Sequence, residues 1–132
     1  MNRIVEELKK VGVFFIATTD KKGAPHVRPF GAVCEFEGKA YICTNNAKAC
    51  YEQMTSNPKT EISAMYPNGD WLRLSGELVR DDRDEAREAM LEANENLKAM
   101  FHIGDKVMEV LYLKNVKCTK YSFNAAPVVI EC

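Results

Sequence analysis

The stretch that decides the fold runs from Gly23 to Met54 and contains three segments, GAPHVRPFGAV (23–33), YICTNN (41–46) and AKACYEQM (47–54). Alternating side chains predict a strand over residues 26–36, and the Glu37–Gly38 pair predicts a tight hairpin into a strand over residues 39–44. A helix is expected to follow directly. This order of elements predicts an antiparallel sheet with a helix packed against it.

Arg28 is the first candidate site residue. Alternate residues share one face of a strand, and beyond His26 and Arg28 that face is apolar, with Phe30, Ala32, Cys34 and Phe36. A guanidinium there needs an anion or a route to water, because desolvating an unpaired charge is costly. Its fork of donors suits a phosphate group. The alternatives are an ion pair with a carboxylate at the edge of the core and a side chain that extends into solvent.

Lys48 is the second candidate. Asn46 is expected to cap a helix that Pro58 ends, which puts Lys48 in the first turn. The positive end of the helix dipole disfavours a lysine there by roughly 0.3–1 kcal/mol and favours an anion. The alternative is a surface lysine that tolerates this cost. Thr44, Asn45 and Asn46 supply further donors just ahead of the helix. We call the predicted phosphate-binding site the phosphate cradle; Arg28, Thr44, Asn45 and Lys48 are the members expected to bind the ligand.

The whole chain predicts about seven strands and three helices. Helices are expected over residues 2–11, after Asn46, and over residues 82–93 with a short continuation past Asn94. Strands are expected over residues 13–19, 26–36, 39–44, 61–66, 71–79, 107–113 and 116–123. Most strand connections are hairpin-like, so the fold class is mainly β (α+β), a small antiparallel barrel with flanking helices. A length of 132 residues predicts one domain over residues 1–132.

Composition excludes several classes of function. The net charge is −1 without a basic run, which argues against nucleic-acid binding. No apolar stretch is long enough to span a bilayer, and the N-terminal segment is an amphipathic helix rather than a signal peptide, so a cytoplasmic protein without membrane association is expected. Five cysteines without a CxxC pair and only two histidines predict neither a disulfide framework nor a metal site. Cys43 adjoins the phosphate cradle, and a redox role is considered for it alone.

The order of these motifs resembles the FMN-binding split-barrel superfamily named for pyridoxamine 5′-phosphate oxidase, and within it the 5-nitroimidazole-resistance-related (Nim) proteins. The resemblance covers nearly the whole chain. It rests on FFIATTDKKGAPHVRPFGAV (14–33), KAYICTNNAKACYEQM (39–54), the NP pair at 57–58, DWLRLSGELVRDD (70–82) and VMEVLYLKNVKCTKYSF (107–123). It implies an antiparallel split β-barrel and a homodimer with FMN in a groove between the subunits.

The resemblance also implies roles for individual residues. The two cations of the phosphate cradle would hold the FMN phosphate, while its threonine and asparagine would hydrogen-bond the phosphate or the ribityl chain. Pro29 and Phe30 would line the flavin. Trp71 opens a strand and could stack on the flavin, although a lid at the barrel edge or a place in the dimer interface are alternatives. His26 falls near a region where a functional histidine is discussed for Nim proteins.

The function implied by the resemblance is a flavin-dependent oxidoreductase that passes electrons from a reduced donor to a small molecule such as a nitro-aromatic or a quinone. Pyridoxamine phosphate is not the expected substrate, because the oxidases that use it carry a C-terminal segment with arginine and tryptophan, whereas this chain ends NAAPVVIEC. No nucleophile–base pair is visible, and the catalytic residues are unassigned. The alternatives are a non-catalytic carrier or sensor of flavin or another phosphorylated ligand, and a relative that binds heme or deazaflavin.

Overall fold

In the computed structural model, which describes residues 2–131, the chain opens with helix α1 (Arg3–Val11). The Asn2 side chain accepts hydrogen bonds from the backbone N–H groups of Ile4 (2.9 Å) and Val5 (3.2 Å), so it caps the helix. Gly12 ends the helix at a φ of +75°, which glycine adopts without strain.

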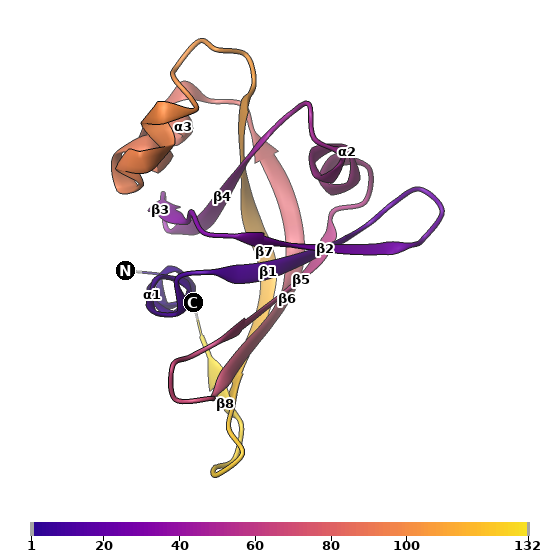
Figure 1. The fold of residues 1–132 in the computed structure, drawn as a ribbon, viewed down its shortest axis with the longest axis vertical. Helices are drawn as coiled ribbons and strands as arrows, with labels where there is room; N and C mark the ends of the chain where they lie inside the picture. The colour runs from indigo at the N-terminus through magenta and orange to yellow at the C-terminus, as the bar shows by residue number, and fades with distance from the viewer. Residues whose placement is uncertain (1, 132) are drawn as a thin grey trace.

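Within residues 2–131, eight strands form one antiparallel sheet in the order β2-β1-β5-β6-β7-β4-β3, with β8 paired to β7. The strands are β1 Phe14–Thr19, β2 Pro25–Phe30, β3 Cys34–Phe36, β4 Lys39–Asn45, β5 Lys59–Met65, β6 Trp71–Asp81, β7 Met108–Tyr121 and β8 Val128–Ile130. Figure 1 shows the sheet curving so that β1 and β2 cross the long strands β6 and β7 steeply. The predicted fold class, a mainly β antiparallel split barrel with flanking helices, is confirmed.

The strand predicted over residues 26–36 is two strands, which corrects the sequence prediction. β2 pairs with β1, and β3 pairs with β4, so the two strands lie at opposite edges of the strand order. Residues 31–33 carry the chain from one edge to the other. Pro29 fits β2 because an edge strand has one side on which a missing N–H removes no ladder hydrogen bond.

The two strands predicted over residues 107–113 and 116–123 are one strand, β7. The connection expected between them at Lys114–Asn115 is instead a bulge, because two residues of β7 lie opposite Gly76 where the register with β6 shifts. Asn115 has a φ of +54° there. A Cβ at Gly76 would lie 3.1 Å from the Lys114 carbonyl oxygen, so this close approach of backbones requires glycine.

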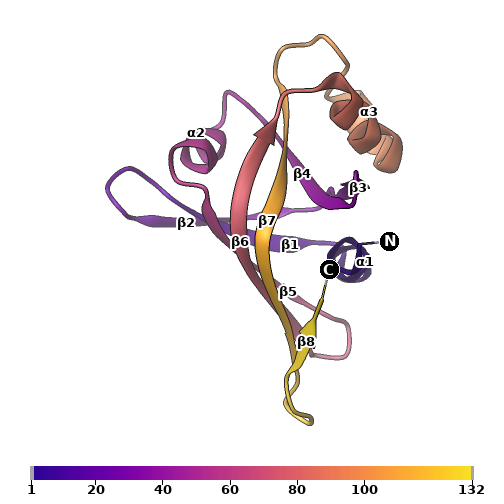
Figure 2. The ribbon, with the colours of Figure 1, turned by 180° about the vertical axis from the view of Figure 1, so that it is seen from behind.

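Two further α-helices and a 3₁₀-helix complete the described chain: α2 (Ala49–Ser56), α3 (Asp84–Ala93) and η1 (Glu95–Ala99). Figures 1 and 2 show α2 and α3 flanking β4 and β7 at one end of the molecule, with β8 at the other end. A small apolar cluster lies under α3 and η1, and the larger core lies inside the curved sheet. Among residues 2–131, no helix has both the length and the apolar character needed to cross a bilayer.

Candidate functional site

Helix α2 begins at Ala49, two residues later than predicted, and Asn46 does not cap it. Lys48 is the N-cap residue and makes no side-chain capping hydrogen bond. The Asn45 side chain forms the turn before the helix, because its Oδ1 accepts from the backbone N–H of Ala47 at 2.8 Å. The amide of Asn46 is held by acceptors that precede or lie on β7, which removes it from the helix.

A cavity of about 660 Å³ lies beside this turn. Its walls come from the end of β2, from β4 and the turn that follows it, and from the segment around η1. The lining residues are Pro29, Phe30, Gly31, Ala32, Cys43, Thr44, Asn45, Lys48, Asn96, Leu97, Met100 and Phe101. Five of the seven predicted cofactor residues are therefore brought together, namely Pro29, Phe30, Thr44, Asn45 and Lys48.

The wall of the cavity formed by the end of β4 and its turn is polar, and the other walls are mainly apolar. Lys48 carries the one charged side chain among the lining residues that the structure describes, and Thr44 and Asn45 lie beside it in sequence. Leu97, Met100 and the other lining residues of the η1 segment are mainly apolar. The volume and this mixture suit a small ligand with an anionic end and an apolar body.

Arg28 does not line the cavity. Its Nη1 donates to the carbonyl oxygen of Ile16 at 3.2 Å and to Oγ1 of Thr18 at 2.7 Å, and its Nη2 donates to Oε1 of Gln53 on α2 at 3.1 Å. All three acceptors are neutral. Within residues 2–131, no carboxylate lies at ion-pair distance from Arg28 or Lys48. The half-buried guanidinium is therefore hydrogen-bonded, while its charge has no counterion among the described residues.

Trp71 also lies outside the cavity lining. Its ring stacks on Tyr121 with centroids 5.5 Å apart and contacts Phe123 at 5.0 Å. Trp71 pairs in register with Met65 of β5, so it shares the outer face of the sheet with that exposed side chain. This position is compatible with the alternatives of a barrel-edge lid or a dimer-interface residue. Trp71 does not line the cavity of its own chain.

Sequence reasoning missed the wall that the η1 segment contributes. Leu97 and Met100 follow helical spacing after α3 and read as core positions, yet the structure brings them and Phe101 to the cavity. Met100 is 65% exposed at the cavity rim. An exposed apolar side chain that lines a cavity is a candidate ligand contact, and this one is visible only once the fold is known.

Cys43 lines the cavity but is a protonated thiol at neutral pH. Burial, with a smaller contribution from Cys34, raises its pKa to about 12. A thiolate is the reactive form of cysteine, so the redox role considered for Cys43 is disfavoured. Neither histidine lines the cavity: His26 contacts Asp20 at 2.9 Å, and His102 lies exposed in the loop before β7.

The chain is similar to a known protein family and to several solved structures. The family described as pyridoxamine 5′-phosphate oxidase matches residues 1–116. A NimC/NimA family protein from Clostridium acetobutylicum is 47% identical, with a TM-score of 0.94 over 98% of this chain and 90% of that chain. A comparison with the curated proteins found no significant match.

Two more distant solved structures share the fold. A pyridoxamine 5′-phosphate oxidase-related, FMN-binding protein from Nostoc punctiforme is 18% identical, with a TM-score of 0.65 over 99% of this chain and 91% of that chain. A heme-binding protein from Mycobacterium smegmatis is 18% identical, with a TM-score of 0.74 over 96% of this chain and 57% of that chain. These two show the fold alone.

The matched residues 1–116 contain every residue that lines the cavity. The resemblance drawn from the sequence motifs is confirmed by this match and by the similarity to the NimC/NimA family protein. The chain therefore belongs to the pyridoxamine 5′-phosphate oxidase family.

Proposed function

We propose that the protein binds FMN in the 660 Å³ cavity and acts as a flavin-dependent oxidoreductase on a small aromatic molecule. The observation that carries this proposal is the composition of the cavity lining, in which Lys48, Thr44 and Asn45 form a polar wall and the other walls are mainly apolar. FMN has a phosphate at one end and a flat ring system at the other, which suits this arrangement. A related protein of the same fold is described as FMN-binding.

The phosphate cradle would hold the FMN phosphate. The Lys48 ammonium is a charge-assisted donor beside the start of α2, where the helix dipole favours an anion. Thr44 and Asn45 offer further donors on the same wall. Arg28 supplies a second positive charge that no described carboxylate neutralises, and its guanidinium would add a donor to the phosphate if the side chain turned from Thr18 and Gln53 toward the cavity.

The apolar walls of the cavity would hold the ring system. FMN, when bound, supplies the electron-transfer chemistry, and the protein supplies position and exclusion of water. Pro29 and Phe30 line one of these walls, while Met100 and Phe101 line another. The protonated thiol of Cys43 provides no nucleophile there, so we expect no covalent intermediate with the protein.

A heme ligand is the weaker candidate for this cavity, although a protein of the same fold binds heme. Imidazole is a common axial ligand of heme iron. Neither His26 nor His102 lines the cavity in the described part of the chain. The visible spectrum of the purified protein separates flavin from heme at once.

Turnover separates the oxidoreductase from a non-catalytic carrier or sensor. The FMN-loaded protein is mixed anaerobically with reduced nicotinamide, and then a nitro-aromatic or a quinone is added. We expect the flavin to be reduced by the donor and reoxidised by the acceptor over repeated cycles. A bound flavin that stays oxidised with every donor would favour the carrier. Oxidation of pyridoxamine 5′-phosphate would contradict the proposed substrate class.

We also propose a homodimer in which a second copy covers the outer face of β1, β2 and β5. Phe15, Val27 and Met65 are 48%, 66% and 68% exposed, and their register places all three on this face. Exposed apolar side chains gathered on one face are typical of an interface. Pro29 shares this face and also lines the cavity, so the interface would adjoin the flavin. A contact of Trp71 with flavin would then cross the interface.

The dimer is tested by the double variant Phe15→Glu, Met65→Glu. We expect this variant to be a monomer in light scattering, because two buried carboxylates would lack partners in the interface. Val128→Glu is the matched control, since Val128 is 56% exposed and pairs with Lys120 on the other face of the sheet. A wild-type protein that is monomeric at micromolar concentration would contradict the dimer.

The cytoplasm is the proposed location. Cys34, Cys43 and Cys50 are free thiols in the structure, and such thiols persist in a reducing compartment. Reduced nicotinamide, the proposed electron donor, is a cytoplasmic metabolite.

A further inference from the structure

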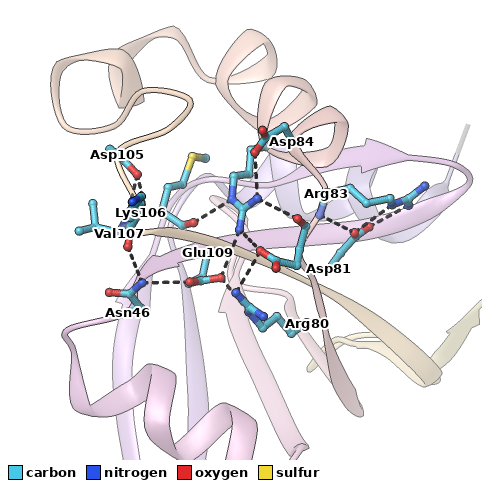
Figure 3. Close-up of polar contacts among 12 residues, drawn as sticks. Asn46, Arg80, Asp81, Arg83, Asp84, Asp105, Lys106, Val107 and Glu109 are labelled. Carbon is cyan, nitrogen blue, oxygen red and sulfur yellow. Dashed lines mark hydrogen bonds and ion pairs between the residues drawn. The ribbon is translucent and has the colours of Figure 1, made fainter.

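Glu109 is a buried carboxylate that the proposed function leaves without a role. It lies on β7 opposite Thr44 of β4 and is 4% exposed. Its Oε1 accepts from Nε of Arg80 at 2.8 Å and lies 3.5 Å from Nη2 of Arg87 on α3. These two guanidinium groups offset the desolvation of the carboxylate. Its second oxygen, Oε2, is directed toward Asn46 (Figure 3).

Asn46 links Glu109 to the phosphate cradle. Its Nδ2 donates to Oε2 of Glu109 at 3.0 Å and to the carbonyl oxygen of Lys106 at 2.9 Å. Its backbone N–H donates to the carbonyl oxygen of Val107 at 2.9 Å. Figure 3 shows Asn46 between Glu109 and the segment that leads into β7. Asn46 alone thus makes three hydrogen bonds to the start of β7 and the two residues before it.

The other hydrogen bonds of this turn do not reach β7. The β4–β7 ladder ends at the pair Asn45 and Met108. Beyond it, Ala47 N–H donates to Oδ1 of Asn45, and Lys48 N–H donates to the Asn45 carbonyl oxygen at 3.1 Å. Among the described residues, Asn46 therefore makes the contacts that fix the turn, and with it Lys48, relative to β7.

The acceptors of Asn46 are themselves fixed. Oδ1 of Asp105 accepts from the backbone N–H groups of Val107 (2.9 Å) and Met108 (3.1 Å). Nε of Arg87 donates to the carbonyl oxygen of Met108 at 3.0 Å. Lys106 sits at a φ of +63°, in the left-handed region, and its carbonyl oxygen accepts from Asn46. The turn is thus attached to a segment that is itself hydrogen-bonded to Asp105 and Arg87.

We propose that Glu109 is a positioning residue for the phosphate cradle, acting through Asn46 to hold Asn45 and Lys48 where the phosphate of a flavin mononucleotide binds. This inference rests on the proposed FMN site. Charge alone gives the opposite expectation for Glu109, because removing a nearby negative charge strengthens binding of an anion. The sign of the effect therefore separates positioning from simple electrostatics.

The test compares FMN with riboflavin, which has the same ring system and no phosphate. Dissociation constants are measured by flavin fluorescence for the wild type, Glu109→Gln and Asn46→Ala. In Glu109→Gln an amide replaces the acceptor that faces Nδ2 of Asn46; Asn46→Ala removes the link without changing charge. We expect Kd for FMN to rise about tenfold in each variant, a loss of about 1.4 kcal/mol, with Kd for riboflavin changed less than about twofold.

Two control variants separate positioning from general damage. Glu77→Gln breaks a contact of the same kind, because Oε2 of Glu77 accepts from Nδ2 of Asn115 at 2.8 Å far along β7. Asp84→Asn removes an ion pair of Arg87 without touching Asn46. Both should leave FMN binding unchanged, and thermal unfolding checks that all variants are folded.

Each remaining outcome has a distinct meaning. FMN affinity that is unchanged in both variants, or increased in Glu109→Gln alone, would overturn the positioning role. Equal losses for FMN and riboflavin would overturn it too, because the effect would not concern the phosphate. If the wild type binds FMN no better than riboflavin, and Lys48→Ala changes neither, the proposed phosphate cradle itself fails.

Discussion

Lys48→Ala is expected to weaken FMN binding by about ten- to a hundredfold, since a charge-assisted hydrogen bond contributes about 1.5–3 kcal/mol. Lys48 is the charged side chain on the polar wall of the cavity, and no described carboxylate competes for it. Arg28→Ala is expected to weaken binding as well, because it removes the second positive charge. The double variant should bind FMN barely at all. Titration with flavin fluorescence measures all three.

The control for this prediction is an exposed cation away from the cavity. Lys22 lies exposed in the turn between β1 and β2. Lys22→Ala should bind FMN as the wild type does. The phosphate cradle is misplaced if Lys48→Ala and Arg28→Ala retain wild-type affinity for FMN. Arg28→Ala also removes the hydrogen bonds of Arg28 to Thr18 and Gln53. Thermal unfolding shows whether their loss destabilises the fold.

Acid is expected to destabilise the fold through Asp81. Its carboxylate accepts hydrogen bonds from Nε and Nη2 of Arg83 at 3.0 and 2.8 Å and from the hydroxyl of Tyr41 at 2.6 Å. The Arg83 contacts, supported by Tyr41, hold the pKa of Asp81 well below its usual value of 3.8. A lowered pKa in the folded state stabilises the protein above about pH 4, and this stability is lost as pH falls toward the folded pKa.

Asp81→Asn should therefore have two effects. At pH 7 it removes the charge from hydrogen bonds worth about 1.5–3 kcal/mol each, so we expect a loss of about 2 kcal/mol in the free energy of unfolding. Between pH 5 and about pH 2, the variant should lose less stability than the wild type, because it lacks the Asp81 carboxylate whose protonation destabilises the folded wild type. Urea unfolding across this range measures both effects. Glu88→Gln, on the exposed side of α3, is the control. Parallel pH profiles for wild type and Asp81→Asn would contradict this assignment.

Features that depend on neighbouring residues in sequence could be predicted. Asn2 and Gly12 bound α1 because capping and left-handed backbone are local preferences. Glu37 and Gly38 form the β3–β4 hairpin with φ of +50° and +76°, as the turn chemistry requires. The alternating leucines of β6 are buried, as the period of two predicts.

Features that depend on distant partners could not be predicted. The residues over 26–36 alternate like one strand, and only the pairing of β2 with β1 and of β3 with β4 separates them. Asn46 has the chemistry of a helix cap, but Glu109, 63 residues away, engages its amide. Local propensity is overridden where a tertiary contact offers a better partner.

The candidate site also combines residues that are neighbours in sequence with residues that only the fold brings together. Thr44, Asn45 and Lys48 are adjacent in the chain, so the polar wall of the cavity was visible in the sequence. Met100 and Phe101 reach the cavity because α3 and η1 fold over the β3–β4 hairpin, and nothing in their local pattern distinguishes them from core residues.

A crystal structure of the protein with FMN decides whether this cavity is the flavin site. We expect the phosphate oxygens within hydrogen-bond distance of Nζ of Lys48 and of donors on Thr44 or Asn45, with the ring system between Pro29 and the η1 segment. A phosphate bound elsewhere, with Lys48 extended into solvent away from it, would rule the cavity out.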